Sequence, residues 1–215
     1  MKKNILNLSA IALIAVATAF TGCKKDDTTP PVVTLTGAAS MTISLQGTYT
    51  EMNATATDEK DGTLTPVISG SVNVNLTGTY TITYTAKDAA GNTGTATRTV
   101  MVKNDADAMT GTYSCSIAGS PPYVYTQTIT ASTTLNKRIG FGKFGDYTGN
   151  TGIYADIVGA TVTLPSQTAL QVGSPAADRT FAGTGSVTST TVFNITYTEV
   201  TNGTTINTVE TYTKQ

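Results

Sequence analysis

From residue 32 onward, hydrophobic and polar residues alternate along most of the chain with a period of two. The clearest stretch runs from Gly78 to Ala86, where hydrophobic residues lie at every second position with threonines between them. Because successive side chains of a strand point to opposite faces, this pattern predicts a strand with one packed and one solvated face. A polar turn at residues 87–92 and a second alternating stretch at 95–102 complete a strand, turn and strand unit. The residues predicted to face inward are Tyr80, Ile82, Tyr84, Ala86, Ala96, Val100 and Val102.

Turn residues divide the chain into two segments of short strands. Between residues 32 and 103 the alternating runs are separated by turn signals at a spacing typical of a β-sandwich. Residues 104–108 are small and polar, and the alternation begins again at Met109. We therefore predict a sandwich domain over 32–103, a linker over 104–108 that proteases can cut, and a second domain over 109–215.

The second domain is predicted to consist of strands alone. Turn residues separate its runs and none is followed by a helical pattern, so sequential antiparallel pairing is expected. About eight hairpin-linked strands suit an up-and-down barrel or a curled meander, because closure of a sheet removes its exposed edges. The runs lie near residues 111–117, 123–131, 137–144, 152–158, 160–164, 167–172, 180–188, 191–199 and 205–213.

The first 22 residues have the pattern of a signal peptide. Lys2 and Lys3 precede an apolar stretch, Ile5 to Phe20, that is shorter than the ~20 residues a membrane-spanning helix needs. The residues that follow, Phe20-Thr21-Gly22-Cys23, resemble the bacterial lipoprotein signal. This resemblance implies that Cys23 becomes the mature N-terminus and carries lipid such as palmitate. The alternative is an ordinary secretory signal followed by an incidental cysteine.

A charged segment comes directly after this cysteine. It consists of Lys24-Lys25-Asp26-Asp27 and resembles the export signal that directs Bacteroidetes lipoproteins to the cell exterior. The resemblance implies a lipid-anchored protein of the outer membrane that faces outward, with residues 23–31 as an acylated tether. A solvated charged tether without an export role is the alternative.

Four motifs in the first domain resemble those of one family. In order they are Asp58-Glu59-Lys60-Asp61-Gly62, Gly78-Thr79-Tyr80, Asp88-Ala89-Ala90-Gly91-Asn92 and Val100-Met101-Val102. Their order and spacing are similar to those of the immunoglobulin-like and hyalin-type repeats of bacterial surface proteins, a group also found in a pesticidal crystal protein. The resemblance implies about seven strands in two sheets. It also implies a spacer or adhesion module in place of a catalyst.

The second domain is similar in strand order and length to the lipocalin-like domains of Bacteroidetes lipoproteins. Gly111-Thr112-Tyr113 opens its first strand, and the run from Phe193 to Thr198 lies near its end. The predicted fold class is therefore all-β, an immunoglobulin-like sandwich followed by an antiparallel meander or a lipocalin-like β-barrel. No ligand follows from this resemblance.

The composition narrows the chemistry that this chain can perform. Of 215 residues, 13% are charged, none is His, and the formal net charge is −1. Without His, most hydrolase triads and zinc sites are excluded, and no cofactor is expected. Without clustered Lys and Arg, a nucleic-acid partner is not expected either. Cys115 is predicted to be a buried small hydrophobic residue, because no imidazole is present to activate its thiol.

A glycine-rich string at residues 140–145 has a structural interpretation. It matches the G-x-G-x-x-G pattern of dinucleotide sites, but it leads into turn residues instead of opening a helix. We expect Phe141 or Phe144 to pack inside the second domain, while the glycines let the strand bend.

Three acidic turn residues, Asp58, Asp61 and Asp88, are candidates for a metal site. They supply the hard oxygen ligands that Ca²⁺ prefers, although their spacing is not that of an EF-hand loop. The interpretation that we favour is that these carboxylates hydrogen-bond their own turns, with Gly62 and Gly91 at positive φ.

Three functions fit these observations. The first, which we favour, is a non-catalytic interaction or spacer lipoprotein that contacts the membrane through its lipid and meets a glycan or a surface protein. The second is glycan binding, with tyrosines as stacking platforms unless they fill or rim the β core. The third is a hydrolase that uses carboxylates alone, two of which would have to lie ~5 to 9.5 Å apart in a cleft. The candidate tyrosines are Tyr123, Tyr125, Tyr147 and Tyr154, and the candidate acids are Asp146, Asp156, Asp178, Glu199 and Glu210.

Overall fold

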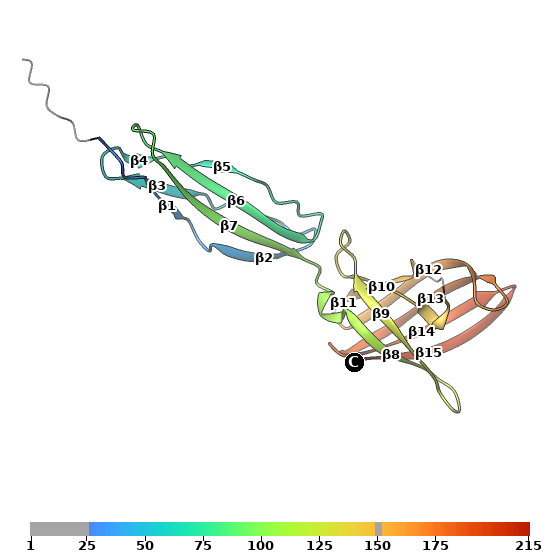
Figure 1. The fold of residues 1–215 in the computed structure, drawn as a ribbon. Coiled ribbons are helices and arrows are strands. Elements are labelled where there is room, and N and C mark those ends of the chain that lie inside the picture. Colours follow the sequence, from blue (N-terminus) through green and yellow to red (C-terminus); the bar gives the residue numbers. More distant parts are fainter. Residues whose placement is uncertain (1–25, 149–151) are drawn as a thin grey trace, which may run out of the picture.

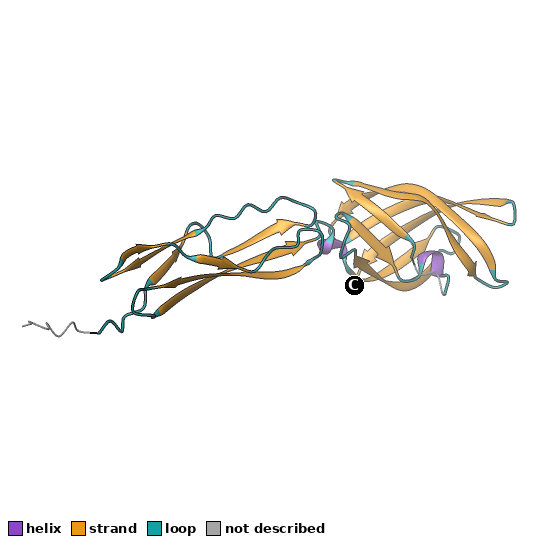
Figure 2. Ribbon diagram, turned by 90° about the horizontal axis from the view of Figure 1, so that it is seen from above, coloured by secondary structure: helices purple, strands orange, loops and turns teal. Residues whose placement is uncertain are grey.

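A computed structural model describes residues 26–148 and 152–215 (Figure 1). It contains two β domains arranged end to end, with residue 26 near the end of the first domain that lies away from the second. Apart from two short 3₁₀ helices, the described elements are strands (Figure 2), which confirms the predicted all-β fold. No helix within the described ranges is long and apolar enough to cross a membrane. The predicted lipidation site Cys23 and the export-signal residues Lys24 and Lys25 lie outside the described residues.

The first domain is a sandwich of seven strands in two sheets, as predicted. The sheets have the orders β1-β3-β4 and β2-β7-β6-β5, and β2 runs parallel to β7 while the other pairs are antiparallel. Because the two longest strands form one hairpin, they provide most of one wall of the core. The strands are β1 (Val32–Leu35), β2 (Ser40–Ser44), β3 (Ala54–Asp58), β4 (Gly62–Leu64), β5 (Val67–Ser69), β6 (Gly78–Lys87) and β7 (Thr93–Lys103).

The inward face of this hairpin agrees with the alternation of the sequence. Most of the predicted inward residues are buried, whereas Tyr80 and Ala96 are half-buried near the strand ends. Arg98 occupies the same face, between Ala96 and Val100, and was not among the residues predicted to face inward. Charged residues are rarely buried, so this position departs from the usual pattern. The buried residues of this face are Ile82, Tyr84, Ala86, Arg98, Val100 and Val102.

Arg98 is fully buried and all of its hydrogen-bonding nitrogens have partners. Its guanidinium donates to Oε1 of Glu51 at 2.8 Å and to the carbonyl oxygens of Ala38 at 3.0 Å and Thr36 at 2.5 Å. It also lies 5.5 Å from the ring centroid of Tyr84. A buried charge is tolerated only when paired and hydrogen-bonded, so this network joins two loops to the centre of β7.

The second domain is a closed barrel of eight antiparallel strands. Consecutive strands pair with each other, and β15 pairs with β8 to close the sheet, with Tyr212 opposite Cys115. Of the two predicted forms, the barrel is therefore the correct one. The strands are β8 (Gly111–Ile117), β9 (Tyr123–Ala131), β10 (Arg138–Phe141), β11 (Tyr154–Val158), β12 (Thr161–Val172), β13 (Ala177–Ser189), β14 (Val192–Thr201) and β15 (Thr204–Lys214).

Two of the predicted runs, 160–164 and 167–172, belong to the single strand β12. The pairing of β12 with β13 shifts register between Leu164 and Gln167, on either side of Pro165. Proline cannot donate a ladder hydrogen bond, and a bulge lets the strand continue past it. The proline that suggested a strand boundary in the sequence thus marks an irregularity within one strand.

The barrel interior is filled by its own side chains. The predicted run 137–144 ends as a strand at Phe141, and the 3₁₀ helix η2 (Phe144–Asp146) then carries Phe144 into the barrel. The Phe144 ring centroid lies 5.0 Å from that of Phe141, 5.2 Å from Phe181 and 4.8 Å from Tyr197. Both Phe141 and Phe144 are buried, which confirms the structural interpretation of the glycine-rich string.

Cys115 lies in the same core, as predicted. Its thiol is fully buried, and burial raises its pKa to about 12. A thiol with so high a pKa is almost entirely protonated at neutral pH and is therefore a poor nucleophile.

The connection between the domains is more structured than a free linker. Asn104 is buried and its amide donates to the carbonyl oxygens of Ser132 at 2.8 Å and Leu135 at 3.0 Å. Its Oδ1 accepts the N–H groups of Ala106 at 2.9 Å and Lys137 at 2.7 Å. The 3₁₀ helix η1, residues Asp107–Met109, follows directly and inserts a buried methionine.

The hairpin loop between β9 and β10 extends this connection to the first domain. The N–H of Asn136 donates to Oε1 of Gln46 at 3.1 Å, and the N–H of Thr77 donates to the carbonyl oxygen of Thr133 at 2.9 Å. Asp105 accepts a hydrogen bond from the Ser44 hydroxyl at 2.6 Å. Because these bonds cross directly between the domains, we expect residues 104–108 to resist bending and proteolysis more than a free linker would.

Candidate functional site

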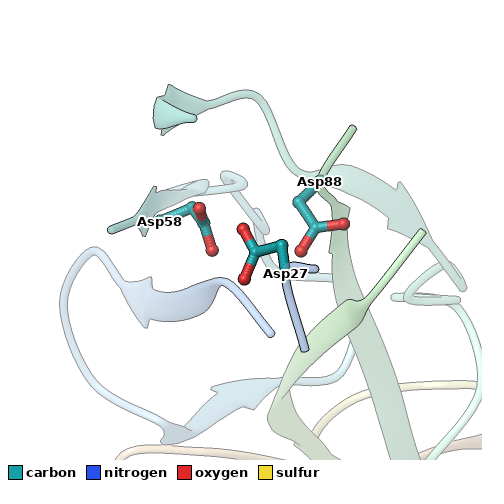
Figure 3. Close-up of side chains that lie close together, drawn as sticks. All are labelled: Asp27, Asp58 and Asp88. Carbon is teal, nitrogen blue, oxygen red and sulfur yellow. The ribbon is translucent and has the colours of Figure 1, made fainter. Parts of the chain in front are cut away.

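The structure brings three carboxylates together at the end of the sandwich that lies away from the barrel. Asp58 at the end of β3 and Asp88 just after β6 meet Asp27, which precedes β1 (Figure 3). One carboxylate oxygen from each of them lies within 4.8 Å of the others. We call these three residues the acidic cluster. Asp61, the third calcium candidate from the sequence, is not a member of the cluster. Its Oδ2 accepts the N–H of Ala89 at 2.6 Å.

Asp58 is positioned by its own turn. Its Oδ1 accepts the N–H groups of Lys60 at 2.8 Å and Asp61 at 3.0 Å, and Gly62 follows at φ 74°. These bonds are the turn role that the sequence analysis favoured for Asp58. They leave Oδ2 buried and without a hydrogen-bond partner, on a residue that is only 8% exposed.

Asp88 is held in a similar way by the turn that follows β6. Its Oδ1 accepts the N–H of Asn92 at 2.7 Å, its Oδ2 accepts the Asn92 amide at 2.7 Å, and Gly91 lies at φ 100°. Burial acts to raise the pKa of Asp88, but hydrogen bonds from Asn92 and the turn amides outweigh it and lower that pKa below its ordinary value. Asp88 is therefore ionised at neutral pH.

Asp27 comes from the segment that the sequence analysis assigned to a tether. Its carbonyl oxygen accepts the Asn92 amide at 3.0 Å, and its Oδ1 lies 3.6 Å from Nζ of Lys60. Farther along, Pro31 is buried, and a Cβ placed on Gly94 of β7 would lie only 1.8 Å from its carbonyl oxygen. The part of the tether that the structure describes is thus docked on the sandwich. Asp27 was missed as a ligand candidate because sequence spacing does not indicate docking of a tether.

In the barrel, Tyr125 is not a stacking platform, contrary to the expectation. It is 7% exposed, on the inward face of β9, and its hydroxyl donates to Oε1 of Glu210. Tyr123 has the same orientation two residues earlier, at the barrel rim, and is 54% exposed. Its ring stacks on Tyr125 with centroids 6.3 Å apart, and its hydroxyl donates to Asp146.

The other two candidate tyrosines have one ring face covered by arginine. The guanidinium of Arg138 lies 3.6 Å from the ring centroid of Tyr154 on β11. The guanidinium of Arg179 lies 4.4 Å from that of Tyr147, whose hydroxyl donates to Glu199 at 3.0 Å. Burial and Glu199 raise the pKa of Tyr147 to about 12. Tyr123 is consequently the candidate whose ring is most exposed.

Four of the five candidate acids have partners that hold them as structural carboxylates. Asp156 pairs with Arg138 at 2.7 Å, Glu199 pairs with Arg179, Asp146 pairs with Lys143 at 2.9 Å, and Asp178 accepts the Gln171 amide at 2.9 Å. For Asp146, hydrogen bonds from Tyr123 and Lys143 outweigh burial and lower its pKa, which opposes a role as proton donor.

Glu210 on β15 is the exception among these acids. It is fully buried, its Oε2 has no hydrogen-bond partner, and burial raises its pKa to about 7. A carboxyl with a pKa near 7 could move protons, but Glu210 is enclosed among tyrosines of the barrel core.

Two shallow grooves lie on the barrel wall. One, of about 380 Å³, is lined by β9, β10 and β11, with Tyr154 and Arg138 among its residues. The other, also of about 380 Å³, is lined by β13, β14 and β15, with Gly183 and Tyr197 among its residues. Both are apolar in the main and neither contains one of the candidate acids.

Several solved structures match this chain, and two of them have low sequence identity to it. The crystal structure of the lipoprotein BT2262 from Bacteroides thetaiotaomicron is 17% identical, with a TM-score of 0.34, and the match covers 86% of this chain and 100% of that one. The structure of CBM51-2 in complex with GlcNAc and INT domains from Clostridium perfringens ZmpB is 14% identical, with a TM-score of 0.28. That match covers 85% of this chain and 43% of the other, so this chain spans less than half of its length. No curated protein matches the sequence.

The first domain also matches a protein family. The matched residues are 33–102, which span the seven strands of the sandwich and include Asp58 and Asp88 of the acidic cluster. The family is described as bacterial surface protein, Ig-like domain. The match supports a location at the cell surface and confirms the resemblance that the four motifs indicated: residues 33–102 match the Ig-like domain of bacterial surface proteins.

Proposed function

We propose that this protein is a lipoprotein of the outer membrane, anchored through Cys23 and facing the cell exterior. Its Ig-like domain acts as a non-catalytic spacer that holds the barrel away from the membrane. The observation that carries this proposal is the end-to-end arrangement of the domains, in which the described chain starts at the end of the sandwich opposite the barrel (Figure 1).

The domain junction supports the spacer function, because a spacer must hold one domain in a defined orientation relative to the next. Asn104 joins the connection to the β9–β10 hairpin, and Asn136 of that hairpin bonds to Gln46 of the first domain. The Asp105 carboxylate accepts hydrogen bonds from the Ser44 hydroxyl and from the Asn136 amide. A junction tied on both sides restricts bending more than a free polar linker would.

The state of the acids supports a non-catalytic barrel. A hydrolase of this composition needs a proton donor and a second carboxylate in one cleft. Glu210 is enclosed, and the other candidates are engaged by Arg, Lys or Gln side chains.

A second candidate function, glycan binding, is favoured by the rim of the barrel. Tyr123 offers an exposed ring whose position is held by Tyr125 behind it, and Asp146 and Lys143 lie beside it with their charges. Sugars stack on aromatic rings and hydrogen-bond to charged groups at their edges.

The anchoring proposal is tested by fractionation and by protease treatment of intact cells. Wild type should be found in the membrane fraction and should be digested by external protease. Cys23→Ser should release the protein from membranes, whereas Cys115→Ala, which changes the buried cysteine, should leave it anchored. The double variant Lys25→Ala/Asp26→Ala should stay anchored but become protected from protease. Protection of the wild type would contradict the outward orientation.

The glycan alternative is tested on a glycan array with the soluble Cys23→Ser protein. A specific hit whose affinity falls about fivefold or more in Tyr123→Ala, but not in Tyr154→Ala, would favour this function, since that loss is the scale of one aromatic contact. An array without hits leaves the spacer as the better proposal.

A further inference from the structure

One buried oxygen atom in the acidic cluster has no partner. Asp58 is 92% buried and its Oδ2 accepts no hydrogen bond, although its Oδ1 accepts two. Figure 3 shows this carboxylate directed toward that of Asp27, with Asp88 on the other side. A buried carboxylate oxygen without a donor loses its hydration and receives nothing in return, which is a strong reason to look for a missing ligand.

We propose that Asp27, Asp58 and Asp88 bind a calcium ion, which fastens the segment after the anchor to the Ig-like domain. The cation supplies the partner that Asp58 Oδ2 lacks and neutralises three carboxylates that otherwise repel one another. The other oxygens of the cluster can still bind it, because a carboxylate oxygen that accepts one N–H has a second lone pair.

The dimensions of the cluster suit calcium. Ca²⁺ takes six to eight oxygen ligands at about 2.3 to 2.6 Å, so two oxygens on opposite sides of it are about 4.6 to 5.2 Å apart. The three oxygens already lie within 4.8 Å of one another. Mg²⁺ binds at about 2.0 to 2.1 Å in a strict octahedron, whereas Ca²⁺ accepts longer distances and irregular geometry, so Ca²⁺ is the better match for carboxylates held by separate turns. Zn²⁺ favours His and Cys ligands, and the cluster consists of carboxylates alone.

The positive charge near the acidic cluster is too small to neutralise it, so a divalent ion would still be attracted. Lys60 lies 3.6 Å from Asp27 and its side chain is 43% exposed, so it balances one of three negative charges from the solvent side. A lysine acting as the counter-ion of the cluster is the competing explanation, and it predicts no response to calcium.

Calcium at this position would connect the folded Ig-like domain to the segment that follows the proposed lipid anchor. Asp58 ends a strand of one sheet and Asp88 follows a strand of the other, whereas Asp27 lies only four residues after Cys23. The ion would therefore set the direction in which the domain leaves the membrane. This consequence rests on the proposed anchoring through Cys23, but cation binding does not.

The site is tested on the soluble full-length protein, Cys23→Ser, stripped with chelator. Calorimetric titration with CaCl₂ should detect one site with a dissociation constant on the order of 10⁻⁴ to 10⁻³ M, the range of extracellular modules. Asp58→Asn keeps the amide oxygen that its turn requires and removes the charge, so it should weaken binding at least about tenfold, as should Asp27→Asn. The matched control is Asp61→Asn, which alters the same turn outside the cluster and should bind as the wild type does.

Hydrogen exchange provides a second measurement. If the three carboxylates had only a structural role, calcium would not change the exchange rates. Calcium should slow exchange of amides in residues 27–31 in the wild type and in Asp61→Asn, and should have no such effect in Asp27→Asn.

Three results would overturn the proposal. The first is no heat and no change in melting temperature up to about 10 mM CaCl₂, a concentration above the range of extracellular modules. The second is binding that is equally weakened in Asp61→Asn, or unchanged in Asp27→Asn. The third is a response to MgCl₂ as strong as that to CaCl₂, which would contradict the assignment to calcium. None of these measurements depends on where the protein is located, so a failed localisation experiment would leave the cation site standing.

Discussion

Glu51 in the Ig-like domain and Glu210 in the barrel both accept hydrogen bonds from tyrosine hydroxyls, yet their pKa values move in opposite directions. Burial raises the pKa of each. For Glu51, hydrogen bonds from Tyr49 and Tyr84 and the charge of Arg98 outweigh burial, and its pKa falls below the ordinary value. For Glu210, hydrogen bonds from tyrosines do not outweigh burial, and its pKa rises to about 7.

The difference shows how hydrogen bonds and burial compete at an acid in a small β domain. The sandwich can hold an ionised acid because the hydroxyls of Tyr49 and Tyr84 and a backbone N–H donate to Glu51, and because Arg98 adds its charge from the centre of β7. The barrel interior is filled with rings, so a neutral carboxyl is the form that fits there at acidic pH. The two domains should therefore lose different amounts of stability when an arginine is replaced. Their stabilities should also change in opposite directions with pH.

Replacing Arg98 with Met should cause the largest loss of stability. The substitution leaves Glu51 without its cation and removes the donors to the carbonyl oxygens of Thr36 and Ala38. Breaking a buried pair from one side lowers the free energy of unfolding by about 3 to 5 kcal/mol. Urea denaturation at pH 7, followed by circular dichroism, measures the loss in the first domain.

The matched control for this variant is Arg138→Met in the barrel. Arg138 pairs with Asp156 at the surface, with side chains 25% and 36% exposed. Exposed pairs contribute about 0 to 1 kcal/mol, so the control should be nearly neutral. Similar losses in the two variants would contradict the contrast between the domains.

The pH dependence of the barrel should be the next largest effect. Glu210 has a folded-state pKa of about 7 against an ordinary value of 4.5, so the unfolded chain ionises first as pH rises. Stability of the barrel should therefore fall between pH 4.5 and 7, by about 3 kcal/mol, and then level off. Glu51, with its lowered pKa, should have the opposite effect: it stabilises the sandwich above its ordinary pKa, and that stability is lost as pH falls through its folded-state pKa.

Glu210→Gln separates this effect from other titrations. The variant should remove the fall in barrel stability between pH 4.5 and 7, because no proton is exchanged at this position. Asp178→Asn, at an exposed carboxylate, should retain the wild-type pH profile. Thermal unfolding followed at several pH values is the measurement, and an unchanged profile in Glu210→Gln would show that another group titrates.

Asn104→Ala should have the smallest effect on stability and a visible effect on shape. It removes the side-chain hydrogen bonds to Ser132, Leu135, Ala106 and Lys137, which lowers the free energy of unfolding by about 1 to 3 kcal/mol.

Small-angle scattering should show an extended wild type and a broader distribution of sizes for the variant. Limited proteolysis should cut residues 104–108 in Asn104→Ala but not in the wild type or in Asn207→Ala, which alters an exposed asparagine. Rapid cleavage of the wild type at 104–108 would contradict a fixed junction.

Local pattern was enough to predict most of the strands. Alternation located the hairpin of β6 and β7 and nearly every barrel strand, because the period of two is a local property of the backbone. It failed at Pro165, where the local signal for a break was overruled by continued pairing with β13. It also failed at Arg98, whose position on the inward face follows from the alternation but whose burial depends on Glu51 and on carbonyl groups of a distant loop.

The candidate sites were predicted less well than the fold. Tyr125 and Tyr123 have the same inward orientation on β9, and only the position of the barrel rim separates a buried tyrosine from an exposed one. Asp58 and Asp88 were recognised as acidic turn residues, but their neighbour was taken to be Asp61. The actual neighbour, Asp27, reaches them because the tether docks on the sandwich.

The sequence by itself determined that this is an all-β protein of two domains, that the first has the motifs of a bacterial surface Ig-like domain, and that chemistry based on His is absent. These properties depend on composition, on local periodicity and on turn residues. Only the tertiary structure decided that the barrel closes, that Phe144 fills it, that hydrogen bonds tie the junction to the β9–β10 loop, and that three aspartates from distant parts of the chain meet. The physical reason is that burial, charge pairing and pKa depend on which groups share a space, and packing places together residues whose separation along the chain carries no such information.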